Sequence, residues 1–160
     1  MPNARRSRTI AAPVDDLWAL ICDPHHLPRW WPRVERVEDV EDDAFTEVMK
    51  TRKGKLVRAD YAITERDEDN HTVTWAQQVQ GTPFARVLSS AETQLWLAPA
   101  ARASEVTIEL RQTMVGYSGY SEYGGGIFMG MAPRLGSVMV RRAAAATLDE
   151  ALDGLERIGG

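Results

Sequence analysis

The chain has 160 residues, of which 44% are hydrophobic and 26% are charged. This composition is ordinary for a globular protein with one hydrophobic core, and it argues against a wholly disordered chain. The formal net charge of −4 argues against nucleic acid as the main partner, because phosphate binding needs a basic surface.

The single cysteine, Cys22, excludes an intrachain disulfide and, with it, the usual reason to suspect secretion. The N-terminus lacks the apolar core of a signal peptide, and no apolar run approaches the length of a membrane span. We therefore expect one domain over residues 1–160, located in the cytoplasm.

The first third of the chain predicts a strand followed by two short helices. Residues 6–13 favour a strand that runs into a turn, and Pro13 suits the start of a helix. Residues 14–23 repeat apolar side chains at helical spacing until an Asp-Pro pair stops the helix. Residues 26–31 have room for only a short helical turn between prolines.

From Val34 onward the apolar period changes to two, which is typical of strands. Turn residues separate the runs, so these strands are expected to form an antiparallel meander with one face toward solvent. The six candidate strands are residues 34–40, 45–51, 54–70, 71–81, 91–99 and 104–115.

A loop rich in glycine and tyrosine, residues 116–128, follows the strands, and from about residue 129 the chain predicts one long helix to its end. Charged residues share one side of this helix. Val140 and Ala144 belong to the opposite side, where the side chains are small over the first half of the helix. Only this helix is long enough to cover the dry face of the sheet, which gives an α+β layout. The pattern of small helix residues against a bulky sheet fits either tight packing or a cavity.

The order of these elements resembles the START-like proteins of the SRPBCC superfamily, which have the helix-grip fold. The most specific part is the first helix, its Asp-Pro stop and the segment LPRWWPRVERV, residues 27–37, that enters the second strand. The branch that it most resembles is that of polyketide cyclase/dehydrase and lipid transport, and residues 23–32 are also similar to heat-shock-ATPase activator-like proteins. The resemblance implies a curved antiparallel sheet of about seven strands wrapped round the C-terminal helix, usually with an apolar cavity between them.

Motifs for metal or nucleophilic chemistry are missing from the sequence: it contains no HExxH, no paired CxxC and no GxSxG. The three histidines are His25, His26 and His71, and the adjacent pair on a turn points in different directions. We therefore predict no metal site and no cofactor.

The candidate site is a pocket between the sheet and the last helix, with the glycine- and tyrosine-rich loop as its lid. The sequence assigns no catalytic residue, and the loop tyrosines have a second interpretation, in which their rings cap the mouth and their hydroxyls face water. The candidate ligand-binding residues are Trp31, Tyr61, Trp75, Gln77, Gln112, Met114, Tyr117, Tyr120, Tyr123, Phe128, Val140 and Ala144.

Three functions fit this pocket and fold. The first is binding of a hydrophobic, lipid-like or polyketide-like small molecule without catalysis. The second is a polyketide cyclase or dehydratase in the same cavity, in which the tyrosines and Gln77 orient carbonyl groups. The third is a protein-interaction module, as in the heat-shock-ATPase activator-like proteins, that uses the outer face of the sheet.

Trp96 lies out of phase with Leu95 and Leu97 on its strand. Its position indicates an exposed patch or a contact in a homodimer, unless a strand bulge turns it inward.

Overall fold

The structure is a computed structural model that describes residues 3–51, 53–115 and 136–159, without the side chains of residues 136–140. Its elements are β1 (Asn3–Ile10), α1 (Val14–Cys22), the 3₁₀ turn η1 (Pro24–His26), α2 (Leu27–Trp30), β2 (Val34–Glu38), β3 (Ala44–Lys50), β4 (Leu56–Asp67), β5 (Thr72–Gln77), the 3₁₀ turn η2 (Pro83–Arg86), β6 (Leu88–Ala100), β7 (Ala103–Met114) and α3 (Gly136–Gly159).

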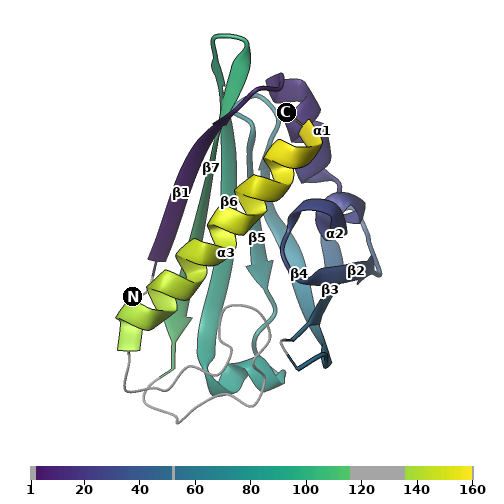
Figure 1. Cartoon of the computed structure of the whole chain (residues 1–160). Helices are drawn as coiled ribbons and strands as arrows, with labels where there is room; N and C mark the ends of the chain where they lie inside the picture. Colours follow the sequence, from purple (N-terminus) through teal and green to yellow (C-terminus); the bar gives the residue numbers. More distant parts are fainter. Residues whose placement is uncertain (1–2, 52, 116–135, 160) are drawn as a thin grey trace.

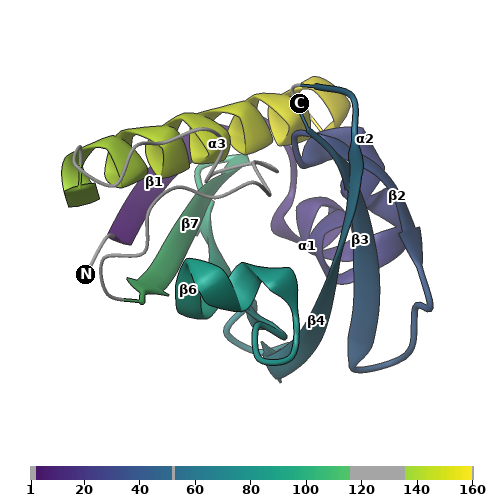
Figure 2. The same ribbon diagram turned by 90° about the horizontal axis from the view of Figure 1, so that it is seen from below.

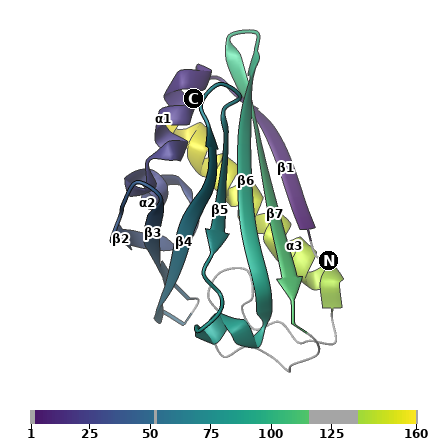
Figure 3. The same cartoon turned by 180° about the vertical axis from the view of Figure 1, so that it is seen from behind.

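All seven strands belong to one antiparallel sheet with the order β1-β7-β6-β5-β4-β3-β2. The sheet curves, and α3 lies across its inner face (Figures 1 and 3). Because β1 and β2 stand at opposite edges, the chain between them must cross the sheet, and α1, η1 and α2 make this crossing. The expected α+β helix-grip architecture is confirmed.

The helix α3 is held mainly by β1 and by α2, with fewer contacts to β7 and α1. Its apolar side is buried through Leu148, Leu152 and Leu155, and Arg8 on β1 pairs with Asp153 on its outer side. Seen from below, the helix spans from the β1 edge to α2 on the other side of the molecule (Figure 2). The middle strands therefore curve beneath a helix that is supported mostly at its two flanks.

Several element bounds differ from the sequence-based expectation. The strand expected over residues 71–81 ends at Gln77, because the chain then turns through Gly81 at a φ of 81° into η2. The strand expected over residues 91–99 is longer, since β6 starts at Leu88 and reaches Ala100. The loop expected over 116–128 and the first residues of the last helix, 129–135, lie outside the described residues.

Trp96 stays on the outer face of β6, where it is half-buried. The guanidinium carbon of Arg5 lies 5.2 Å from the centre of its ring, a cation–π contact from the neighbouring part of the sheet. The register shift in β6 falls between Leu88 and Ser90, too far along the strand to turn Trp96 inward. A homodimer contact at this residue stays a prediction.

Within the described ranges, no helix combines the length and apolar character that crossing a membrane requires.

Gly154 sets how closely α3 approaches α2. A Cβ atom added at Gly154 would lie 2.7 Å from the Cα atom of Trp30, closer than real Cβ contacts. That neighbour is backbone, so it cannot move aside as the end of a flexible side chain can. The absence of a side chain at Gly154 therefore lets the two helices touch at this point.

We predict that Gly154→Ala destabilises the protein by about 2–3 kcal/mol, because α3 must move away from Trp30 to accept the methyl group. An ordinary glycine-to-alanine change inside a helix would instead stabilise by up to about 1 kcal/mol. Urea unfolding measures the difference. Ala146→Gly, at an exposed position of the same helix, is the control for helix propensity and should cost about 1 kcal/mol. A stabilised Gly154→Ala variant would contradict this account of the helix contact.

Candidate ligand-binding site

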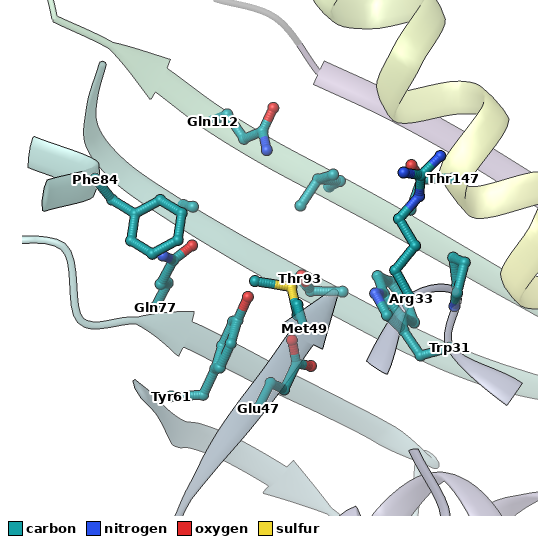
Figure 4. Close-up of a pocket in the computed structure, with 13 residues that line it drawn as sticks. Trp31, Arg33, Glu47, Met49, Tyr61, Gln77, Phe84, Thr93, Gln112 and Thr147 are labelled. Atoms are coloured by element: carbon teal, nitrogen blue, oxygen red, sulfur yellow. The ribbon is translucent and has the colours of Figure 1, made fainter. Parts of the chain in front are cut away.

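A cavity lies between the inner face of the sheet and α3. The space open to the centre of a water molecule is about 50 Å³, whereas one water needs about 10–15 Å³ by this measure. The cavity therefore admits several waters or part of a small molecule. Figure 4 shows its lining residues, which are Trp31, Pro32, Arg33, Glu47, Met49, Tyr61, Gln77, Phe84, Ala91, Thr93, Leu110, Gln112 and Thr147.

Strand register brings the aromatic part of the wall together. Phe45, Tyr61 and Gln77 stand opposite one another on β3, β4 and β5, so their side chains share the inner face. The rings of Phe45 and Tyr61 stack with their centres 5.3 Å apart and their planes 8° apart. Trp75 lies in the core behind the wall, and its ring centre is 6.0 Å from that of Trp31. The aromatic wall is thus fixed by packing as well as by the backbone.

Glu47 is a carboxylic acid inside this apolar wall. It alternates with Phe45 and Met49 on β3, and the period of two places all three on the inner face. Its side chain is almost fully buried, and its Oε2 atom has no hydrogen-bond partner among the described residues. Burial raises the pKa of Glu47 to about 8, although a hydrogen bond from Tyr61 lowers it in part. The carboxyl therefore keeps its proton at neutral pH.

Tyr61 faces the same carboxyl. Burial raises the pKa of Tyr61 well above its ordinary range, and the neighbouring Glu47 adds to this shift. The phenol is therefore neutral at every pH at which the protein is expected to function, and it can donate a hydrogen bond to Glu47 or to a bound molecule.

Unpaired polar atoms gather at the cavity. Four buried side-chain nitrogen or oxygen atoms lack a hydrogen-bond partner in the described part of the chain. Three of them belong to cavity residues, namely Oε2 of Glu47, Nε2 of Gln77 and Oε1 of Gln112, and the fourth is Nε1 of Trp30. A buried polar atom without a partner costs free energy, so each of these three is a place where water or a ligand would bind.

The cavity contains four of the residues that the sequence analysis selected: Trp31, Tyr61, Gln77 and Gln112. Three others are not among the described lining residues: Trp75 and Ala144 are buried in the core, and Met114 packs against it half-buried. Tyr117, Tyr120, Tyr123 and Phe128 lie outside the described residues, as does the side chain of Val140. That any of the twelve binds a ligand stays a prediction.

Sequence reasoning missed Glu47 and Arg33. A signal for Glu47 exists in the segment AFTEVMK, where a carboxylate is in phase with two large apolar residues and therefore points to the core. For Arg33 the sequence offers no such signal, because the residue sits in a turn whose direction is set by its backbone conformation.

No part of the described chain brings together three or more His, Cys, Asp or Glu side chains that could hold a metal ion. His25 and His26 form hydrogen bonds with side chains close by in the sequence. Nδ1 of His25 lies 2.8 Å from Oδ1 of Asp23, and Nδ1 of His26 lies 3.0 Å from Nη1 of Arg29. Burial raises the pKa of the Cys22 thiol to about 12, so the thiol keeps its proton at neutral pH.

Comparison with known proteins identifies the family. Residues 1–158 match the family model described as polyketide cyclase/dehydrase and lipid transport. The chain belongs to this family. No curated protein matches it. Solved structures of other proteins share its fold, and one of them is described as a START superfamily protein.

Three of those structures show how widely the fold is shared. A START superfamily protein from Mycobacterium smegmatis is 14% identical at a TM-score of 0.72, covering 98% of this chain and 96% of that one. Ginseng major latex-like protein 151 from Panax ginseng is 15% identical at 0.67, covering 99% of both chains. The di-domain ARO/CYC BexL from the BE-7585A biosynthetic pathway is 19% identical at 0.71, and the match covers 98% of this chain and 46% of BexL. At these identities the likeness shows the fold alone.

The raised pKa of Glu47 predicts a pH-dependent stability. Between the ordinary pKa of 4.5 and about 8, the folded protein keeps the Glu47 proton while the unfolded chain loses it. The free energy of unfolding therefore falls as pH rises through this window, by at most about 1.4 kcal/mol per pH unit from this group. Glu47→Gln should remove this contribution, so its stability relative to wild type should rise from pH 5 to pH 9.

Urea unfolding at several pH values measures the effect. Glu105→Gln, which removes an exposed carboxylate on β7, should leave the pH dependence unchanged. A constant difference between Glu47→Gln and wild type over this pH range would show that Glu47 titrates normally.

Proposed function

We propose that the protein binds a hydrophobic small molecule, lipid-like or polyketide-like, in the cavity between the sheet and α3. The observation that carries the proposal is that three buried polar atoms without a partner among the described residues, from Glu47, Gln77 and Gln112, lie at one cavity with aromatic residues in its lining. Small-molecule sites in proteins have this composition, a mostly apolar lining with a few polar groups that fix orientation.

The chemistry of the lining describes the ligand. Gln77 offers a donor, Gln112 an acceptor and the protonated Glu47 either one, so the ligand should carry carbonyl or hydroxyl groups on an apolar body. The ring of Tyr61, held in place by its stacking on Phe45 in the core, favours a flat or cyclic body. The family description, which includes lipid transport, supports the same class of ligand.

We predict that native mass spectrometry of the purified protein detects a co-purifying molecule of this class. Ala91→Leu should lose it, because the larger side chain fills the cavity from β6. Ala98→Leu is the matched control, since Ala98 is exposed on the same strand and should keep the ligand. Equal ligand occupancy in both variants would contradict binding in this cavity.

A second candidate is a cyclase or dehydratase that acts on a polyketide-like substrate in the same cavity. The observation that favours it is the contact of the Glu47 carboxyl with the Tyr61 hydroxyl beside open space. A Glu47 carboxylate could take a proton from a methylene between two carbonyls, and the resulting enolate carbon could form a bond to a distant carbonyl carbon. The proton would return from Glu47 to the new alkoxide, which Tyr61 stabilises by donating a hydrogen bond.

The cyclic alcohol formed in this step becomes an aromatic ring when it loses its hydroxyl as water and its ring ketones enolise. We predict for this candidate that a linear poly-β-keto ester is cyclised and dehydrated, as followed by the ultraviolet absorbance of the aromatic product. The rate should rise with pH around 8, where Glu47 becomes a carboxylate. Glu47→Gln should lower kcat by about 10²–10⁴-fold and abolish this pH profile. Binding of the ester without turnover would leave the protein as a binder and exclude the enzyme.

A further inference from the structure

The described lining of the cavity contains one cationic side chain, that of Arg33, which has no counter-ion among the described residues. Arg33 lines the cavity, and no residue of the described ranges forms an ion pair or a hydrogen bond with its guanidinium group. Other arginines of the sheet are paired: Arg5 and Arg111 bind Glu109, while Arg58 binds Glu38. Among the described residues, Arg33 thus differs from these arginines in lining the cavity and in having no partner.

The backbone holds Arg33 in a conformation that arginine seldom adopts. Its φ is 67°, in the left-handed region that favours glycine and asparagine. Five non-glycine residues of the described chain have a positive φ, and among these five only Arg33 lines the cavity. Its carbonyl oxygen accepts a hydrogen bond of 2.9 Å from the Lys50 amide, which fixes it against β3. A residue needed only to make this turn would be better as glycine, so the strain suggests that the side chain has a use.

The two preceding residues stiffen this corner. Pro32 has a fixed φ, and the residue before a proline is restricted to extended backbone, which Trp31 adopts with φ −83° and ψ 130°. The Trp31 amide, just after α2, also donates a hydrogen bond of 2.8 Å to the carbonyl of Leu27, the first residue of that helix. Trp31, Pro32 and Arg33 therefore form a rigid corner that presents all three residues to the cavity.

Arg33 stands where the cavity meets the outside. It also lines an outer cleft between the α2–β2 corner and α3, to which Glu150 and Asp153 belong. Figure 4 shows its side chain reaching toward Thr147 on α3, away from Gln112 and Phe84. Asp153 pairs with Arg8 instead of with Arg33. The guanidinium can thus stay partly hydrated and still meet a group inside the cavity.

The charge balance of the described lining favours an anion. Its titratable groups are Glu47, Tyr61 and Arg33. At neutral pH Glu47 keeps its proton and Tyr61 is neutral, so the net charge of these groups is that of Arg33 alone. A planar guanidinium can bind both oxygens of one carboxylate, which gives orientation as well as affinity.

We propose that the cavity takes an amphiphilic monocarboxylate whose carboxylate pairs with Arg33. The apolar body of the ligand lies along Trp31, Met49 and Phe84, and its far polar groups meet Gln77 and Gln112. This inference rests on the proposed function, since it needs the cavity to accept a ligand.

Two isosteric probes test the proposal on the full chain at pH 7: 2-naphthoic acid, which carries a carboxylate, and 2-naphthamide, which is neutral. Titration calorimetry and quenching of tryptophan fluorescence, to which Trp31 contributes, measure both affinities. We expect wild type to bind the acid about tenfold more tightly than the amide, the size of one partly buried charge-assisted hydrogen-bonded pair.

Variants assign this preference to one residue. Arg33→Asn removes the charge but suits the positive φ, so its Tm should match or exceed that of wild type while the preference for the acid disappears. Arg33→Lys should keep part of the preference. The control Arg36→Asn makes the same change of charge on β2, where Arg36 is exposed and pairs with Glu38, and should keep the full preference.

Three results would overturn the proposal, and they distinguish failure of the Arg33 anchor from failure of the proposed function. Equal affinity of wild type for the acid and the amide, or an unchanged preference in Arg33→Asn, refutes the Arg33 anchor and leaves binding in the cavity intact. No binding of either probe, together with no co-purifying molecule in the native mass spectrum, refutes the proposed function and the anchor together.

Discussion

The contact between Gly154 of α3 and the backbone of Trp30 is the constraint on which the rest of the site depends. It brings the last helix down onto α2 at one flank of the sheet, while the ion pair of Arg8 with Asp153 and the packing on β1 hold the other flank. A helix fixed at two flanks bridges the curved middle strands, and their side chains cannot all reach it. The cavity follows from this geometry, and so does the position of the Trp31–Arg33 corner, which continues directly from α2.

The cavity combines a mostly apolar lining with a few polar side chains. Its walls are aromatic and aliphatic, yet they contain a carboxylic acid, two amides and one cation. Burial keeps the acid protonated, so a group that would be an anion at the surface acts here as a neutral donor. Unpaired polar atoms in a core normally reduce stability, and they persist where a bound molecule or water satisfies them. This balance links the energetics of the fold to the proposal that the cavity binds a ligand.

Much of the architecture could be predicted from the sequence. The period of two in the strands and the long amphipathic end predicted an α+β layout, and the resemblance to START-like proteins implied the helix-grip fold. Alternation also placed Tyr61 and Gln77 on one face of their strands. Trp31 was among the predicted ligand-binding residues, and it lines the cavity in the structure. Arg33, two residues later, lines the cavity as well, although the sequence did not indicate it. The sequence analysis passed over Glu47, since a glutamate in a strand usually faces water and only its phase with Phe45 and Met49 indicates otherwise.

The sequence by itself determined which side chains alternate inward and where each helix stops, because these properties depend on neighbours within a few residues along the chain. Only the tertiary structure decided that α3 stands far enough from the middle strands to leave a cavity, since helix height depends on one close approach between residues 124 positions apart. It also decided the direction of Arg33, because a positive φ in a turn is set by the strands that the turn must join. The alternation of residues along each strand thus specified the inner face of the sheet, and the long-range packing of α3 left a cavity over part of that face.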